Sequence, residues 1–239
     1  MTFSMKDLKK TFRGRAVVNG LSLDVHQGEI VGLLGPNGAG KTTAFYLAVG
    51  LIKPDKGAVF FNNQEITTFP LHQRARMGMG YLAQEPSILR YLTVSQNIQC
   101  ILESLALSKG ERKEKLEQLL QELRLEPLAN KLAISLSGGE RRRLEITRAL
   151  ATSPTLLLLD EPFANIDPIS VDEVKQMILH LSNKNISILI TDHNAREIFS
   201  IVHRSYLVRD GKVFLSGSVK ELTENPEARR TYLGDHFSM

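Results

Sequence analysis

Residues 35–42, which read Gly-Pro-Asn-Gly-Ala-Gly-Lys-Thr, constrain the possible folds of this chain more than any other segment. They fit the pattern G-x-x-x-x-G-K-[ST], in which a glycine-rich turn joins a buried strand to a helix and wraps around phosphate. Residues 30–34 are apolar and predict the strand, and residues 41 to about 51 predict the helix. Because the flanks agree with the motif, we favour a phosphate-binding loop over a chance resemblance.

Each residue type in this loop has a chemical reason. The glycines let the backbone turn tightly and aim consecutive N–H groups at one anion, next to a positively polarised helix N-terminus. Lys41 can reach the β- and γ-phosphates of a nucleoside triphosphate, and the Thr42 hydroxyl suits Mg²⁺, which prefers oxygen ligands. The predicted nucleotide contacts are Gly35, Pro36, Asn37, Gly38, Ala39, Gly40, Lys41, Thr42 and Thr43.

A second motif follows at residues 156–162, Leu-Leu-Leu-Leu-Asp-Glu-Pro. Four consecutive leucines are typical of a strand buried on both faces of a parallel sheet. Two carboxylates emerge at its end: Asp160 is predicted to help hold Mg²⁺, and Glu161 to orient or deprotonate an attacking water. The alternative, that both are ordinary surface acids, leaves their paired placement unexplained.

The alternation of strand and helix signals predicts an α/β fold with one interruption. Residues 2–34 are rich in strand signals, whereas residues 87–152 show helical apolar stripes and two capping boxes, Thr93 with Gln96 and Ser108 with Glu111. We therefore predict a discontinuous core, residues 1–86 and 153–239, that carries an inserted helical subdomain, residues 87–152. Cys100 lies among apolar residues of this insertion, which predicts a buried structural thiol.

The segment Leu136-Ser137-Gly138-Gly139-Glu140 opens a helix predicted to run to about Ala151. A third capping box explains Ser137 and Glu140 but not the two glycines, which destabilise a first helical turn relative to alanine. Glycines make sense where the backbone approaches another group closely, and a helix N-terminus with free amides suits phosphate.

Three further residues are weaker candidates. Gln84 and His193 each follow a predicted strand, and open α/β sheets bind ligands at the carboxyl ends of their strands. Phe12 lies in a polar stretch, where an aromatic ring could stack on a base or make a small satellite core contact; the residue alone does not decide between them.

Composition limits the remaining classes of function. The formal net charge is +4, and short basic runs such as residues 141–143 lack interleaved aromatics, so we expect solvated faces and no nucleic-acid partner. No apolar run approaches the length that spans a bilayer, and the N-terminus lacks the apolar region of a signal peptide. These features predict a cytoplasmic protein that reaches a membrane only through a partner.

The phosphate loop, Leu-Ser-Gly-Gly-Glu and the Asp-Glu pair, in this order, resemble the ATP-binding cassette ATPases over nearly the whole chain. That resemblance implies a P-loop NTPase (RecA-like) core with an antiparallel β subdomain, and ATP and Mg²⁺ as cofactors. It also implies roles: Phe12 stacks on adenine, Gln84 contacts Mg²⁺ and water, and His193 contacts the γ-phosphate. Ser137, Gly138, Gly139 and Glu140 would bind the ATP held by a second copy in a head-to-tail homodimer, across which Asp167 communicates.

Finer matches at residues 80–85, 135–143, 160–171 and 190–194 resemble the ATPase subunits of bacterial lipopolysaccharide exporters. This implies a motor on the cytoplasmic face of the inner membrane, with two integral-membrane permease subunits docking near residues 84–102. Two alternatives remain: a branched-chain amino-acid importer ATPase and a soluble iron–sulfur assembly ATPase. Ala83, Leu89, Tyr91 and Asn165 depart from the exporter pattern, the middle two in the segment expected to face the membrane partner.

Overall fold

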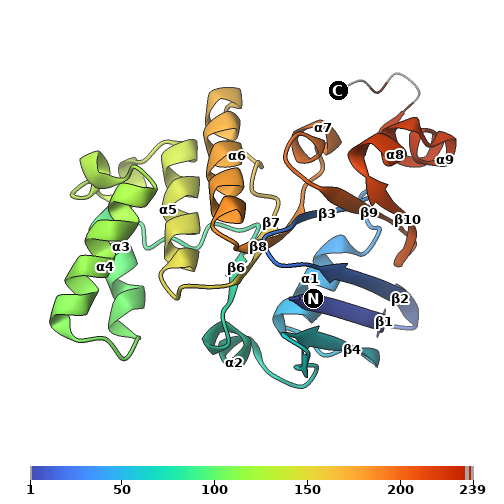
Figure 1. Cartoon of the computed structure of the whole chain (residues 1–239), viewed down its shortest axis with the longest axis horizontal. Coiled ribbons are helices and arrows are strands. Elements are labelled where there is room, and N and C mark those ends of the chain that lie inside the picture. The colour runs from blue at the N-terminus through green and yellow to red at the C-terminus, as the bar shows by residue number, and fades with distance from the viewer. Residues whose placement is uncertain (1, 235–236, 238–239) are drawn as a thin grey trace.

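The computed structural model describes residues 2–234 and residue 237. Within them the strands form two sheets, a larger one ordered β10-β9-β3-β8-β7-β6 and a smaller one ordered β2-β1-β4-β5 (Figure 1). The strands are β1 (Phe3–Phe12), β2 (Arg15–Val25), β3 (Ile30–Leu34), β4 (Lys56–Phe61), β5 (Gln64–Glu65), β6 (Met79–Leu82), β7 (Leu156–Asp160), β8 (Ser187–Thr191), β9 (Arg204–Arg209) and β10 (Lys212–Ser218). The helices are α1 (Lys41–Val49), α2 (Leu71–Arg76), α3 (Val94–Glu103), α4 (Lys109–Glu122), α5 (Gly138–Leu150), α6 (Pro168–Asn183), α7 (Ala195–Phe199), α8 (Val219–Glu224) and α9 (Pro226–Ala228), with short turns η1 (Glu126–Leu128), η2 (Ala133–Ser135) and η3 (Arg229–Leu233).

The centre of the larger sheet is parallel, as the apolar runs predict. Strands β3, β7 and β8 are buried at every position, because helices or the second sheet cover both of their faces. β9 and β10 form an antiparallel hairpin, whose turn residues Asp210 and Gly211 have φ angles of 52° and 75°. The α/β class is therefore confirmed, and so is the antiparallel β region that the resemblance implied.

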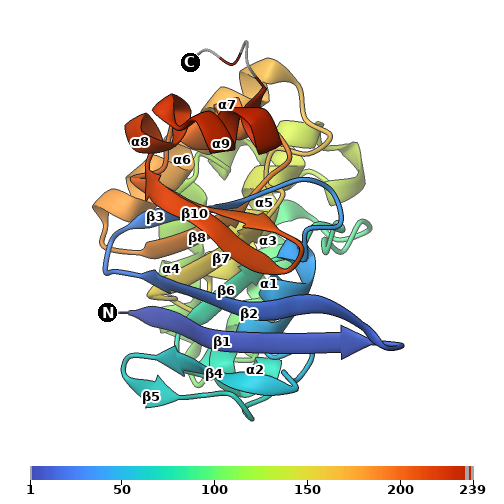
Figure 2. The ribbon, with the colours of Figure 1, turned by 90° about the vertical axis from the view of Figure 1, so that its right-hand side faces the viewer.

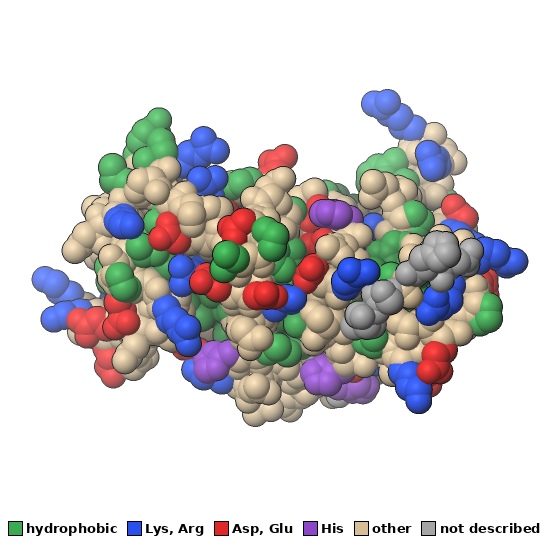
Figure 3. Space-filling view, turned by 90° about the horizontal axis from the view of Figure 1, so that it is seen from above, with side chains coloured by type: hydrophobic (Ala, Val, Ile, Leu, Met, Phe, Trp, Pro, Cys, Tyr) green, Lys and Arg blue, Asp and Glu red, His purple; other side chains and the backbone are tan. Residues whose placement is uncertain are grey.

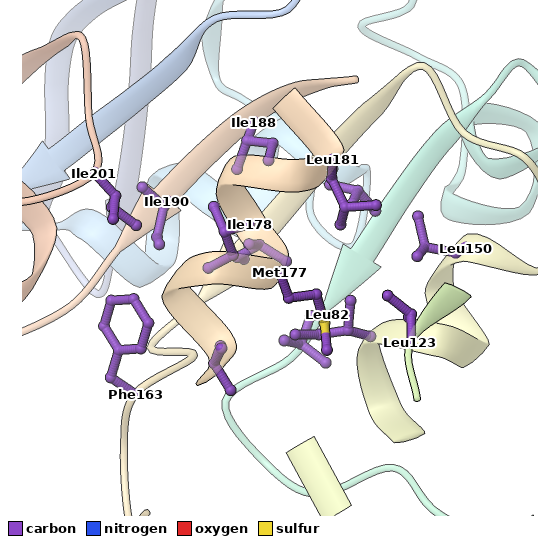
Figure 4. Close-up of a cluster of buried hydrophobic side chains, with 14 of the residues drawn as sticks. Leu82, Leu123, Leu150, Phe163, Met177, Ile178, Leu181, Ile188, Ile190 and Ile201 are labelled. Carbon is purple, nitrogen blue, oxygen red and sulfur yellow. The ribbon is translucent and has the colours of Figure 1, made fainter. Parts of the chain in front are cut away.

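The larger sheet separates two hydrophobic cores. One core lies between the larger sheet on one side and α1 with the smaller sheet on the other (Figure 2). It includes alternate residues of the central strands, such as Leu158 and Leu189. The other packs α5, α6 and α7 against the intervening residues, such as Ile188 and Ile190. Figure 4 shows this second core continuing from the sheet to Leu123, at the end of α4. Consequently α1 and α5 cover opposite faces of the sheet.

Residues 87–152 contain helices and short turns but no named strand among the described elements. Both predicted capping boxes are present, at Thr93 and Ser108, and start α3 and α4. The prediction for Cys100 was wrong, because its side chain is exposed. A residue two positions from buried Ile98 and Leu102 lies about 200° around the helix, which turns it towards solvent.

The surface shows acidic and basic side chains interspersed with hydrophobic ones over the face in Figure 3. Among the described residues, no helix combines the length and the apolar character needed to cross a bilayer.

Candidate functional site

The loop at residues 35–42 joins β3 to α1, as its sequence predicts. Its glycines are required by packing as well as by backbone angle. A Cβ atom at Gly35 would lie 2.2 Å from the carbonyl oxygen of Val208, and one at Gly40 would lie 2.5 Å from that of Val17. Both have positive φ, 156° and 100°. The loop is therefore pressed between β9 and β2 with its shape fixed.

Lys41 closes this loop from within. Its side chain is buried, and Nζ donates hydrogen bonds to the carbonyl oxygens of Gly35 at 2.7 Å and Pro36 at 3.1 Å. Burial lowers the pKa of the Lys41 ammonium, while the charges of Glu161, Asp160 and Asp192 oppose that shift. The Lys41 ammonium thus lies inside the loop and within the electrostatic influence of three acids.

Asp160 ends β7 as a buried carboxylate that lacks a hydrogen-bond partner. It is 1% exposed, and neither oxygen accepts a hydrogen bond from any residue that the structure describes. Burial, and then the charge of Glu161, raise the pKa of Asp160 to about 6. An unpartnered buried carboxylate is costly unless a cation binds it, so its two oxygens fit a hard divalent ion.

The register of the parallel strands brings Gln84 beside Glu161. Leu82 of β6 is paired with Leu159 of β7. Gln84 follows Leu82 by two residues, and Glu161 follows Leu159 by two residues. Gln84 Nε2 donates to Glu161 Oε2 at 2.8 Å. Glu161 also has a φ of 49°, in the left-handed region that ordinary side chains rarely adopt. Neighbouring structure must hold this backbone in place.

Arg142 of α5 provides that restraint, and sequence reasoning missed it. Its guanidinium donates from Nη2 to the Glu161 carbonyl at 2.6 Å, from Nε to the Pro162 carbonyl at 2.8 Å and from Nη1 to Glu145 at 2.8 Å. The expectation of a solvated face for residues 141–143 was wrong at this position, since Arg142 is 5% exposed. The buried acid one turn ahead, Glu145, was the available sequence signal.

His193 follows β8, the strand next to β7. Its side chain is 63% exposed, with Nδ1 3.3 Å from Oδ1 of fully buried Asp192. Asp192 is itself held by the backbone N–H groups of Phe163 and Asn194. Asp192 therefore orients the imidazole through Nδ1, while the rest of the His193 ring is exposed to solvent at the carboxyl edge of the sheet.

The structure does not bring the segment 137–140 to the phosphate loop. The Ser137 hydroxyl accepts from the Glu140 N–H at 3.2 Å, and Glu140 accepts from the Ser137 N–H at 2.8 Å, which completes the predicted capping box. No hydrogen bond among the described residues links this segment to the loop, which belongs to the opposite face of the sheet. Part of the glycine requirement is internal, because a Cβ at Gly139 would lie 2.2 Å from Ser170 Oγ on α6.

Phe12 ends β1 beside the turn that leads into β2. The ring is 44% exposed, so it is not a core contact. The carbonyl of Val17, a few residues further along the same hairpin, lies close to Gly40, since a Cβ at Gly40 would be 2.5 Å from it. The hairpin that carries Phe12 therefore lies against the phosphate loop.

Comparisons with known proteins agree with this arrangement. The profile of the family described as ABC transporter matches residues 18–164. The lipopolysaccharide export system ATP-binding protein LptB of Acidithiobacillus ferridurans is 53% identical, over 98% of this chain and 97% of that protein. The protein of the same name from Escherichia coli K12 is 46% identical, over 100% and 99%.

Solved structures give the same result for the fold. MJ1267, an ATP-binding cassette of an ABC transporter in its ADP conformation, has a TM-score of 0.88 and 27% identity, over 98% of this chain and 99% of that chain. The dimeric post-hydrolysis structure of the cassette MJ0796 with ADP and Pi has a TM-score of 0.80 and 26% identity, over 91% and 98%. The chain therefore belongs to the ATP-binding cassette (ABC) transporter family and is an ATP-hydrolysing subunit of that family.

Proposed function

We propose that this chain is the motor subunit of a lipopolysaccharide exporter and that two copies hydrolyse ATP between them. The relatives named for lipopolysaccharide export are 46–53% identical over nearly the whole chain, which favours this cargo. The hydrolytic part of the proposal is carried by one observation: Lys41, Asp160, Gln84 and Glu161 converge at one edge of the sheet. In that arrangement a bound phosphate chain would lie close to a cation, Lys41, to a metal ligand, Asp160, and to a general base, Glu161.

Each group at this edge has a task in the proposed reaction. Lys41 and the loop amides neutralise charge on the phosphates. Glu161 takes the proton of the attacking water, Gln84 orients that water, and His193 contacts the γ-phosphate. Asp160, Thr42 and Gln84 would hold Mg²⁺; the unpartnered oxygens of Asp160 support this. When bound, the ion supplies further neutralisation of phosphate charge.

The second copy is proposed because each chain carries two phosphate-binding elements that do not meet. The loop with Lys41 and the segment 137–140 lie on elements that cover opposite faces of the sheet. A head-to-tail pair with two-fold symmetry would place the segment of each chain against the ATP of the other. Asp167 would then lie near the junction between the two copies. Within its own chain, its carboxylate caps α6 by accepting hydrogen bonds from the N–H and the hydroxyl of Ser170. The dimeric relative MJ0796 is a precedent.

An apolar surface near the helical segment is proposed to bind the membrane partner. Residues 90–92 run beside residues 133–134, joined by Ile134 N–H to Arg90 carbonyl and Ala133 N–H to Leu92 carbonyl hydrogen bonds, each 2.9 Å. Around this pairing the exposed large hydrophobic side chains are Leu89, Tyr91, Leu132 and Ile134. Such a cluster fits a cytoplasmic helix of a permease subunit docking near residues 84–102. The motor would then lie on the cytoplasmic face of the inner membrane.

Isolation of the native complex in detergent tests the proposal. Two integral-membrane subunits should co-purify with the chain, and the reconstituted complex should release lipopolysaccharide from vesicles only when ATP is present. A complex that takes up branched-chain amino acids would favour the importer alternative. Cytosolic partners alone would favour the iron–sulfur assembly alternative.

A further inference from the structure

Lys10 lies beneath the ring of Phe12. Both residues belong to the end of β1, where the pairing with β2 is irregular between Lys10 and Thr11. The Lys10 Nζ is 5.7 Å from the centroid of the Phe12 ring, within the range of a cation–π interaction. One ring face is thus occupied by the ammonium group, although the ring as a whole remains 44% exposed.

Asp55 fixes this lysine in place. Its Oδ1 accepts from Lys10 Nζ at 2.9 Å, and its Oδ2 accepts from the N–H of Thr11 at 2.7 Å, so one carboxylate holds the two residues that precede Phe12. The Asp55 N–H in turn donates to the Lys9 carbonyl at 2.8 Å. Hydrogen bonds from Lys10 and Thr11 lower the pKa of Asp55.

The residues around Phe12 approach the phosphate loop from two sides. Asp55 lies on the connection between α1, which starts at the phosphate loop, and β4. On the other side, the Val17 carbonyl of β2 lies so close to Gly40 that a Cβ there would be 2.5 Å from it. The end of the hairpin that carries Phe12 is therefore bonded through Asp55 to the connection after α1, and its second strand lies against the phosphate loop.

We propose that Lys10 and Asp55 hold Phe12 as a rigid platform for the adenine base, with Lys10 acting as a positioning residue. This inference rests on the proposed stacking of adenine on Phe12. A cation below the ring draws π-electron density to the covered face, and the opposite face then becomes a better partner for an electron-rich purine. A preorganised ring also avoids the entropy cost of ordering it when nucleotide binds.

The chain contains no tryptophan, which allows a direct optical test. Phe12→Trp introduces a single indole, and stacking of ADP on it should quench its fluorescence. Adding Lys10→Met to that variant should weaken ADP binding roughly two- to fivefold, the range expected for one exposed cation–π contact. Binding of inorganic tripolyphosphate, which has no base, should be unchanged when both are measured by calorimetry. Lys10→Arg should restore the affinity for ADP.

Lys6 offers a matched control on the same strand, because its Nζ lies 4.7 Å from the ring centroid of Phe60. Lys6→Met removes the same chemistry away from the proposed base site and should leave both ligands unaffected. Equal ADP affinity with and without Lys10 would contradict the proposal that Lys10 positions Phe12. An equal loss of affinity for ADP and for tripolyphosphate would contradict it as well. If ADP binds by calorimetry without quenching the indole at position 12, the stacking role of Phe12 itself fails, and this inference fails with it.

Discussion

Arg142 Nη2 donates a hydrogen bond of 2.6 Å to the backbone carbonyl of Glu161. The arginine belongs to α5, the helix that begins at Gly138, and the glutamate follows β7. The same guanidinium also neutralises buried Glu145, so one side chain links the helix, the strand end and a buried acid. The helix that carries the proposed phosphate-binding segment 137–140 thereby restrains the backbone of the proposed catalytic base within the same chain.

Removing Arg142 should lower both the stability of the fold and the rate of ATP turnover, and a second substitution should distinguish the two effects. Arg142→Met leaves Glu145 as an uncompensated buried acid, which should cost about 3–5 kcal/mol in the free energy of unfolding. Arg142→Met combined with Glu145→Met should regain most of that stability, since a buried ion pair is replaced by apolar side chains. ATP turnover should stay low in both variants, because the Glu161 backbone remains untethered. Urea unfolding and phosphate release measure the two effects. Recovery of turnover in the double variant would mean that Arg142 acts through stability alone.

Glu161→Gln tests the proposed base. Loss of a positioned general base lowers rates by about 10²–10⁴-fold, so phosphate release should collapse by that factor while ATP is still bound. Because ATP is then trapped, a dimer should persist on size-exclusion chromatography with ATP and separate into monomers without it. A chain that stays monomeric at saturating ATP would contradict the head-to-tail pair.

Gly139→Ala tests the packing role of the glycines at residues 138 and 139 in the absence of nucleotide. A Cβ there would lie 2.2 Å from Ser170 Oγ and 2.5 Å from Ser170 Cβ, so α5 and α6 would have to separate. We expect a loss of about 1–3 kcal/mol in the free energy of unfolding, as for other overpacked sites. Gly138→Ala is the matched control, since its Cβ would lie 3.3 Å from the nearest atom, and should cost less. Adding Ser170→Gly to Gly139→Ala should restore stability. Equal losses for the two alanine variants would exclude this explanation.

Glu29 should make folding sensitive to acid. Arg204 donates to it at 2.6 and 3.0 Å and also binds Asp24, which joins β2 and β9 near the start of β3. Burial raises the pKa of Glu29, but hydrogen bonds from Arg204 and the His26 N–H outweigh burial, and the net shift is downward. A lowered pKa in the folded state adds stability above the unfolded pKa, about 4.3, and this stability is lost as pH falls through the folded value.

Denaturation of the parent chain and Glu29→Gln in urea between pH 7 and pH 3 measures this effect. The variant should be less stable at pH 7, and the difference should shrink as pH falls below about 4.3 and vanish below the lowered pKa of Glu29 in the folded chain. A constant difference across that range would show that Glu29 contributes through packing rather than charge.

The sequence predicted those parts of the fold that local chemistry determines. The strand, turn and helix around residues 35–42 and the capping boxes at Thr93, Ser108 and Ser137 are confirmed, because each depends on residues within a few positions of one another. Gln84 was a weak candidate alone. Its hydrogen bond to Glu161 depends on the register of β6 against β7, which a single strand does not reveal.

Two buried arginines were the parts that sequence reasoning did not find. Arg142 is one residue in a run of three arginines, a pattern that a solvated helix face shares. Arg74 is 1% exposed and donates to the carbonyl oxygens of Leu47, Ala48, Thr67 and Phe69, with no acid among its hydrogen-bond partners in the described part of the chain. Such partners are distant backbone groups, so no residue type in the sequence signals them.

The bonds from Lys41 to the Gly35 and Pro36 carbonyls have a consequence for the thermodynamics of nucleotide binding. The loop is already folded around its own cation, so binding exchanges one set of hydrogen bonds for another and orders little backbone. The unfavourable entropy of closing the loop is therefore part of the free energy of folding and is not incurred again when nucleotide binds. Nucleotide affinity therefore responds to the strength of the phosphate contacts, with little contribution from loop closure.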